Sequence, residues 1–218
     1  MVLEAGVDEA GKGPVLGPMV MAGVLIDDAD IPKLKKLGVK DSKLLTPAQR
    51  EKLYPEIIKI VKDYKILIIP PAEIDEAVQS ETLNLNRLEA IKSAMICNSL
   101  NPERIILDCP STNIKSYVEY FKYYLKRKSV EIIAEHKADV NYPSVSAASI
   151  LAKVTRDAEI EKIKKEIGYE CGSGYPSDPT TIEFLKKYHK RYEHIFRKSW
   201  ATYQNVVKNK PQKSLSEY

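Results

Sequence analysis

Four acidic residues end or follow short apolar segments, at the places where a β-strand would give way to a loop. Asp8 and Glu9 end the first apolar run, Asp108 ends a second, and Asp139 comes shortly after a third. Ligands gather where the strands of an α/β sheet end. An all-oxygen site selects a hard cation such as Mg²⁺ or Mn²⁺. Two such ions held ~4 Å apart can bind both the attacking water and the leaving oxygen of a phosphodiester.

Asp8 and Glu9 present a geometric difficulty, because neighbouring side chains of a strand point to opposite faces of the sheet. Both can reach one site only if the strand bends there. Gly11, two residues further along, can supply such a bend. The alternative is that the two acids form an acidic turn at the protein surface.

Gly11, Lys12 and Gly13 follow the first two acids directly and are followed by Pro14. Glycines let the backbone come close to a ligand, and the lysine places a positive charge nearby. The segment therefore predicts a phosphate-binding loop beside the metal site.

Short apolar runs, and apolar residues at helical spacing, predict the elements that would position these side chains. Strands are expected at residues 1–7, 19–26, 64–69, 104–107 and 130–134. Helices are expected at residues 31–37, 46–61, 82–100, 117–125 and 142–167. The second helix should begin with Thr46 as its cap and Pro47 in its first turn, and Pro55 should kink or split it. The early strands suit antiparallel pairing and the later ones suit parallel pairing through helices, which predicts an α/β fold.

The sequence changes character near Pro179, which predicts a catalytic domain at 1–179, a C-terminal helical part at 180–207 packed on the core, and a flexible tail at 208–218. The helical part carries an aromatic residue at every fourth position, namely Phe184, Tyr188, Tyr192, Phe196 and Trp200. We interpret these residues as two helices that each bury an aromatic face. A platform on which bases stack is the alternative.

Composition fits a soluble, cytoplasmic, monomeric protein. Of 218 residues, 44% are apolar and 29% are charged, and no apolar run approaches the ~20 residues of a membrane span. Cys97, Cys109 and Cys171 lack metal-ligand spacing and are expected to be buried free thiols. Residues 183–213 carry nine Lys or Arg and two Glu, an excess that suits a polyanionic substrate, although a solvated helix face gives the same pattern.

Five segments resemble a known family. They are residues 7–14 (VDEAGKGP), 41–43 (DSK), 136–139 (HKAD), 144–157 (SVSAASILAKVTRD) and 172–178 (GSGYPSD). Together they resemble ribonuclease HII, the type 2 ribonuclease H, in its archaeal form, and the match runs from residue 1 to about residue 205. The resemblance implies a ribonuclease H-like mixed five-stranded sheet flanked by helices, with a helical C-terminal part.

The same resemblance implies a metal-dependent endoribonuclease that hydrolyses the RNA strand of RNA/DNA duplexes. It implies cutting on the 5′ side of single ribonucleotides embedded in DNA, which leaves 3′-hydroxyl and 5′-phosphate ends. Asp8, Glu9, Asp108 and Asp139 correspond to the family's catalytic, metal-binding acids. A non-catalytic nucleic-acid binder is the alternative; it would not need four converging acids, and a chelator would not affect it.

The substrate-binding residues are also implied by the resemblance. Gly11, Lys12 and Gly13 correspond to a glycine-arginine-glycine loop that reads the ribose 2′-hydroxyl, largely through its backbone. Lys12 keeps the charge of the commoner arginine but lacks its planar fork. Tyr175 corresponds to a tyrosine that stacks on the sugar next to the RNA–DNA junction. Lys43 is a further candidate for a phosphate contact, with a solvated side chain as the alternative.

Two further features have open interpretations. Gln212, Leu215 and Tyr218 resemble the peptide that docks on the replication sliding clamp, but the usual pair of aromatic residues is reduced to one. A disordered tail is the alternative. His136 lies near Asp139 in the sequence, and it either transfers protons or has a structural role.

Overall fold

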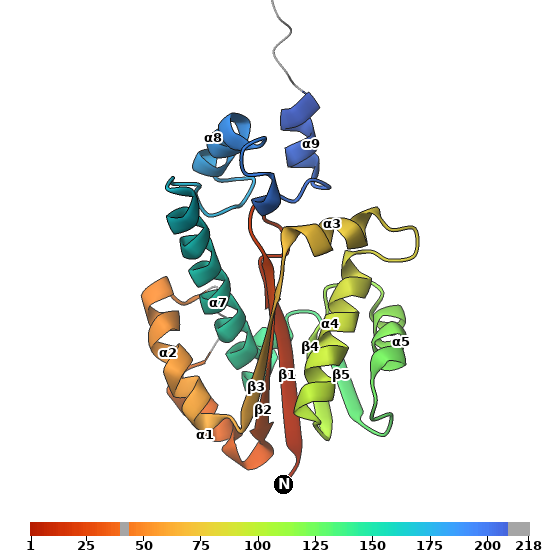
Figure 1. Cartoon of the computed structure of the whole chain (residues 1–218). Helices are drawn as coiled ribbons and strands as arrows, with labels where there is room; N and C mark the ends of the chain where they lie inside the picture. The colour runs from red at the N-terminus through yellow and green to blue at the C-terminus, as the bar shows by residue number, and fades with distance from the viewer. Residues whose placement is uncertain (40–43, 209–218) are drawn as a thin grey trace, which may run out of the picture.

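The computed structural model describes residues 1–39 and 44–208. Within them, five strands form one mixed sheet in the order β3-β2-β1-β4-β5 (Figure 1). The strands are β1 (Leu3–Ala10), β2 (Met19–Asp27), β3 (Asp63–Ile69), β4 (Arg104–Asp108) and β5 (Glu131–Glu135). The first three pair in antiparallel fashion, whereas β1 with β4 and β4 with β5 are parallel. The mixed five-stranded sheet that the sequence predicts is therefore confirmed.

Helices cover both faces of this sheet (Figure 1). One face carries α4 (Leu85–Leu100) and α5 (Ile114–Tyr124), and the other carries α1 (Ile31–Leu37), α2 (Pro47–Ile60) and α7 (Pro143–Ile167). Side chains of β1 alternate between the two layers: Ala5 and Val7 join the core under α4, whereas a Cβ atom on Gly6 would lie 2.3 Å from the backbone of Ser144 in α7. The first turns of α7 therefore lie directly against the central strand.

Helix α2 begins as predicted but is not split by its proline. Thr46 accepts a hydrogen bond from the Gln49 amide and the Gln49 side chain accepts one from the Thr46 amide, which completes a capping box. A single helix then continues to Ile60 with Pro55 inside it, so of the expected kink or split, the split is wrong. Pro55 is exposed, and water can satisfy the carbonyl that its ring leaves without a hydrogen bond.

Two helices are additions to the predicted pattern. The Pro70-Pro71 pair ends β3, and Pro71 also begins α3 (Pro71–Gln79), because proline suits the first turn of a helix. Helix α6 (Ala138–Asn141) is a single turn between β5 and α7. It is too short to show a helical period in the sequence, yet it carries Asp139.

The C-terminal part packs beyond the end of the central strands (Figure 1). It contains α8 (Pro179–Tyr188), a short 3-10 turn (Glu193–Ile195) and α9 (Ala201–Lys208). Phe184 and Phe196 are buried, with ring centroids 6.0 Å apart. The predicted burial of the aromatic residues is thus confirmed for these two, but the placement on two helices is wrong. Only Phe184 and Tyr188 are helical, because the chain leaves the helix after Tyr188.

The remaining composition-based predictions concern the thiols and membrane spans. Cys97, Cys109 and Cys171 are buried and free, as predicted. No helix in the described part of the chain is both long enough and apolar enough to cross a membrane.

Candidate active site

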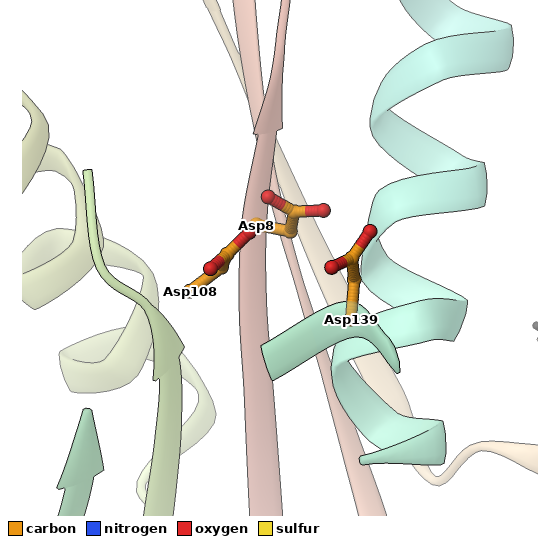
Figure 2. Close-up of side chains that lie close together, drawn as sticks. All are labelled: Asp8, Asp108 and Asp139. Atoms are coloured by element: carbon orange, nitrogen blue, oxygen red, sulfur yellow. The ribbon is translucent and has the colours of Figure 1, made fainter. Parts of the chain in front are cut away.

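Three aspartates meet at one end of the sheet (Figure 2). Asp8 lies on β1, Asp108 is the last residue of the parallel strand β4, and Asp139 lies on α6. One carboxylate oxygen from each lies within 4.8 Å of the others. The backbone amide of Ala138 donates to Asp108 Oδ1 at 3.2 Å, which fixes α6 against the end of β4. Topology therefore brings together acids that are separated by 100 and 31 residues in the sequence.

The electrostatics of this acid cluster (Asp8, Asp108 and Asp139) favour a cation. Burial, together with the charges of Asp108 and Asp139, raises the pKa of Asp8 to about 7, against the opposing hydrogen bond from Ser149. Three carboxylates so close together need a proton or a cation to offset their repulsion. Since every donor is a carboxylate oxygen, the residues fit a hard divalent cation.

Glu9 borders the acid cluster without joining it. Strand β1 continues to Ala10, so Glu9 stays on the opposite face from Asp8. Both acids nevertheless line one cavity of about 270 Å³ at the end of the strand. Burial, followed by the nearby charge of Glu89, holds the pKa of Glu9 well above its usual range. The structure thus brings three of the four predicted acids together and places the fourth beside them.

The glycine loop (Gly11, Lys12 and Gly13) lines the same cavity, together with Tyr175. Gly11 has a φ of +82°, a left-handed conformation in which a Cβ atom would lie 3.0 Å from the Pro18 carbonyl oxygen. Gly13 is different, because a Cβ atom there would meet only Tyr175, at 3.9 Å. Gly11 is thus required by the backbone, whereas Gly13 keeps the space in front of Tyr175 open.

The Lys12 side chain is anchored below the loop. Its ammonium group lies 2.7 Å from Glu89 Oε2 and 2.9 Å from Asn86 Oδ1, both on α4. Glu89 is fully buried, so Lys12 neutralises a charge inside the protein. Sequence reasoning missed Glu89. The signal that was available is an acid among the apolar residues of an otherwise buried helix face.

Tyr175 is held by a buried arginine. The guanidinium of Arg156 lies 5.3 Å from the centre of the Tyr175 ring and donates to the Ser173 carbonyl at 2.7 Å. Arg156 is only 2% exposed. Arg156 therefore supports Tyr175 from inside the protein.

The remaining residues singled out from the sequence are His136, Lys43 and the three tail residues. His136 Nδ1 lies 2.9 Å from the Cys109 carbonyl oxygen, a contact that fits the structural interpretation of this histidine. Lys43, with the rest of the 41–43 motif, lies outside the described residues. The same is true of the three tail residues Gln212, Leu215 and Tyr218.

Comparison with known sequences gives one consistent result. The ribonuclease HII family model matches residues 5–203. Ribonuclease HII of Pyrococcus horikoshii is 49% identical over 207 residues, which cover 93% of this chain and 91% of the relative. Ribonuclease HII of Methanococcus maripaludis strain C7 is 52% identical over 210 residues, which cover 93% and 86%.

Solved structures agree with these relatives. The ribonuclease H2 of Pyrococcus horikoshii superposes with a TM-score of 0.85 at 48% identity, over 94% of this chain and 97% of that one. The ribonuclease HII of Archaeoglobus fulgidus, solved in a complex with PCNA, gives 0.83 at 40% identity, over 99% and 100%. A Bst ribonuclease HIII solved with Mn²⁺ gives 0.81 over 95% and 70%, but at 23% identity it supports the fold alone.

Proposed function

Since this chain belongs to the ribonuclease HII family, which cleaves the RNA of RNA/DNA hybrids, we propose that it also cuts DNA duplexes on the 5′ side of a single embedded ribonucleotide. The cut would leave 3′-hydroxyl and 5′-phosphate ends. The observation that carries this proposal is that the acid cluster and the glycine loop line one cavity. A group that can hold a scissile phosphate and a group that can approach a ribose therefore stand side by side.

Asp8, Asp108 and Asp139, with Glu9 beside them, are the residues that would bind the metal. Mg²⁺ or Mn²⁺, held as a pair of ions by these carboxylates, would supply positive charge to the attacking water and to the leaving oxygen. Ser149 orients Asp8 through a hydrogen bond, and the Ala138 amide orients Asp108. These contacts hold the carboxylates in place before substrate arrives, so that little reorganisation is needed during the reaction.

The glycine loop and Tyr175 would select the position of the cut. A 2′-hydroxyl is the group that distinguishes RNA from DNA at a single nucleotide. Backbone amides of the loop can donate to it because Gly13 carries no side chain that would keep the sugar away. Tyr175, supported by Arg156, presents its ring across the cavity for stacking on the neighbouring sugar.

The decisive experiment uses a labelled DNA duplex that contains one ribonucleotide, incubated with and without Mg²⁺, with Mn²⁺ in a parallel reaction. We expect a single metal-dependent cut on the 5′ side of the ribonucleotide, and no cut in the matching all-DNA duplex. Cleavage of long RNA/DNA hybrids alone would leave the acid cluster intact as the catalytic site but would refute the role of the glycine loop and Tyr175.

We also propose that the tail binds the replication sliding clamp through Gln212, Leu215 and Tyr218. Two observations support this: the spacing of these residues, and the solved complex of PCNA with the Archaeoglobus fulgidus enzyme, which matches 99% of this chain. Deletion of residues 212–218 should abolish binding to PCNA in a pull-down and leave cleavage of the single-ribonucleotide duplex unchanged. Equal binding by the deletion variant would refute the proposal.

A further inference from the structure

Two residues of the C-terminal part hold the glycine loop from behind; we call Arg197 and Trp200 the C-terminal clasp. The Arg197 guanidinium donates to the carbonyl oxygens of Gly11 at 2.6 Å and of Lys12 at 2.8 Å. Its Nε atom donates to a third carbonyl, that of Gly17, at 3.1 Å. Trp200 Nε1 donates to the Gly13 carbonyl at 3.1 Å. The carbonyls of Gly11, Lys12 and Gly13, which are all the carbonyls of the glycine loop, therefore accept hydrogen bonds from the C-terminal clasp.

This arrangement fixes the direction of the amides that follow those carbonyls. In a planar trans peptide, the C=O and the next N–H point in opposite directions. With the Gly11 and Lys12 carbonyls turned toward Arg197, the amides of Lys12 and Gly13 must point away from it. Neither amide donates a hydrogen bond to another residue in the described part of the chain. Two backbone donors are therefore aimed outward, on a loop that lines the catalytic cavity.

Trp200 fixes a different kind of peptide. The residue after Gly13 is Pro14, which has no N–H. The hydrogen bond from Trp200 to the Gly13 carbonyl therefore positions no donor. Its ring instead lies 5.0 Å from the Arg197 guanidinium and packs against it. Within the C-terminal clasp, Arg197 sets the direction of the amides and Trp200 supports Arg197.

Arg197 is an unusual choice for a merely structural role. Arg197 is 0% exposed, and its side-chain hydrogen bonds within the described part of the chain all go to backbone carbonyl oxygens. Burial and the nearby charge of Arg156 lower the pKa of its guanidinium to about 9. Burying a charge with only carbonyl acceptors is costly, whereas its planar fork can hold several acceptors in fixed directions. The fork is therefore the property that the site uses.

We propose that Arg197 is a positioning residue, which holds the Lys12 and Gly13 amides in the orientation that reads the ribose 2′-hydroxyl. This inference rests on the proposed function of the glycine loop and adds to it a residue 185 positions away in the sequence. Arg197 is fully buried, and its hydrogen bonds go to backbone carbonyls rather than to the acid cluster. Its removal should therefore change the preference for ribonucleotides rather than the hydrolytic step.

The test compares dissociation constants for two DNA duplexes that differ only in one 2′-hydroxyl. Asp108→Asn is used as the background, so that the duplex is not cut during the measurement. The preference is the dissociation constant of the all-DNA duplex divided by that of the single-ribonucleotide duplex. Arg197→Lys keeps the charge but loses the fork, and we expect the preference to fall by about five- to tenfold because one or two hydrogen bonds are lost. Affinity for the all-DNA duplex should stay unchanged.

Three further variants test whether a loss of ribonucleotide preference comes from Arg197 itself. Arg191→Lys is the matched control, because Arg191 is exposed, lies in the same C-terminal part and stacks on Tyr192 rather than on the loop. It should keep the full preference. Trp200→Phe removes a donor that positions no amide, so its preference should fall less than that of Arg197→Lys. Arg197→Gln is neutral and avoids a buried charge; it serves as the second variant should the lysine variant not fold, and it should lose the preference as well.

The outcomes separate the inference from the function on which it rests. If the Asp108→Asn background itself binds both duplexes equally, the reading of the 2′-hydroxyl by the loop is wrong. If that background discriminates and the folded Arg197 variants discriminate equally well, the role of Arg197 is wrong. Melting curves of each variant, with binding measured well below the midpoint, exclude a loss that comes from unfolding.

Discussion

The acid cluster and the glycine loop line the same cavity, but different parts of the molecule hold them. The acid cluster is built by the sheet and the helix that follows it: β1, β4 and α6 bring the aspartates together. The glycine loop is held from outside the sheet, by α4 through Lys12 and by the C-terminal clasp through its carbonyls. Catalysis and substrate selection should therefore be separable by mutation, even though they share one site.

The largest expected effect breaks the acid cluster alone. Asp108→Asn removes one of three carboxylates that would bind the metal, and we expect the rate of cleavage to fall by a thousandfold or more, since loss of a single stabilising group already costs about a hundred- to a thousandfold. The measurement is a single-turnover assay on the single-ribonucleotide duplex. The preference for this duplex in binding should persist, because the loop is held elsewhere. An active variant would rule Asp108 out as a metal ligand.

The next effect concerns stability without metal. Burial raises the pKa of Asp8 from 3.8 to about 7, so the folded, metal-free protein retains a proton that the unfolded chain releases. The free energy of unfolding should therefore fall as pH rises from about 4 to about 7, by up to about 4 kcal/mol. Asp8→Asn should reduce this dependence, with the remainder coming from Glu9 and Glu89, whose pKa values burial also raises, and added Mg²⁺ should restore stability at neutral pH. Denaturant titrations across this pH range, with and without a chelator, measure both effects.

The same denaturant titrations should show that a variant affecting the glycine loop leaves the pH dependence of stability unchanged. Arg197→Lys alters no group that titrates between pH 4 and 7, so its pH dependence should run parallel to that of the wild type. A change in slope in this variant would mean that the C-terminal clasp and the acid cluster are coupled, and that catalysis and substrate selection are not separable by mutation.

Two glycine variants sharpen the comparison within the loop. Gly11→Ala places a side chain in a left-handed backbone conformation, which should cost about 1–2 kcal/mol of stability. Gly13→Ala meets only Tyr175, at 3.9 Å, so its stability should be close to that of the wild type. Both should lower kcat/KM for the single-ribonucleotide duplex, by up to about a hundredfold, because the sugar is kept from the amides. Wild-type kinetics in either variant would refute the assignment of the loop.

The two regions also differ in how well the sequence predicts them. Asp8 and Asp108 lie at the ends of apolar segments, and this local pattern survives in the structure because adjacent parallel strands end at the same edge of the sheet. Asp139 is less evident, since α6 has only four residues. The position of Glu9 depends on whether β1 continues beyond it or bends there. The nearby glycines allow either course, so the sequence alone does not decide between them.

The loop is predicted only in part. Its glycines and lysine are visible in the sequence, but the residues that hold it are not. Arg197 lies 185 residues from Lys12, and Glu89 lies 77 residues away. No periodicity connects such residues, because their contact depends on how the C-terminal part packs against the start of the chain. A charged residue in that region looked instead like part of a basic, solvated surface.

The smallest expected effect tests Glu89, a side chain that lies between the glycine loop and Glu9 at the border of the acid cluster. Glu89 lies beside Glu9, whose pKa it helps to raise, and it also holds the Lys12 ammonium. In Glu89→Gln, the amide oxygen can still accept from Lys12, so we expect a loss of only about 1 kcal/mol of stability. The ribonucleotide preference should stay near that of the wild type, because Arg197 still directs the loop amides. Glu119→Gln, on the exposed side of α5, is the control. A loss of preference as large as that of Arg197→Lys would show that the glycine loop depends as much on Glu89 as on the C-terminal clasp. Substrate selection could then not be separated by mutation from the acidic residues around the metal site.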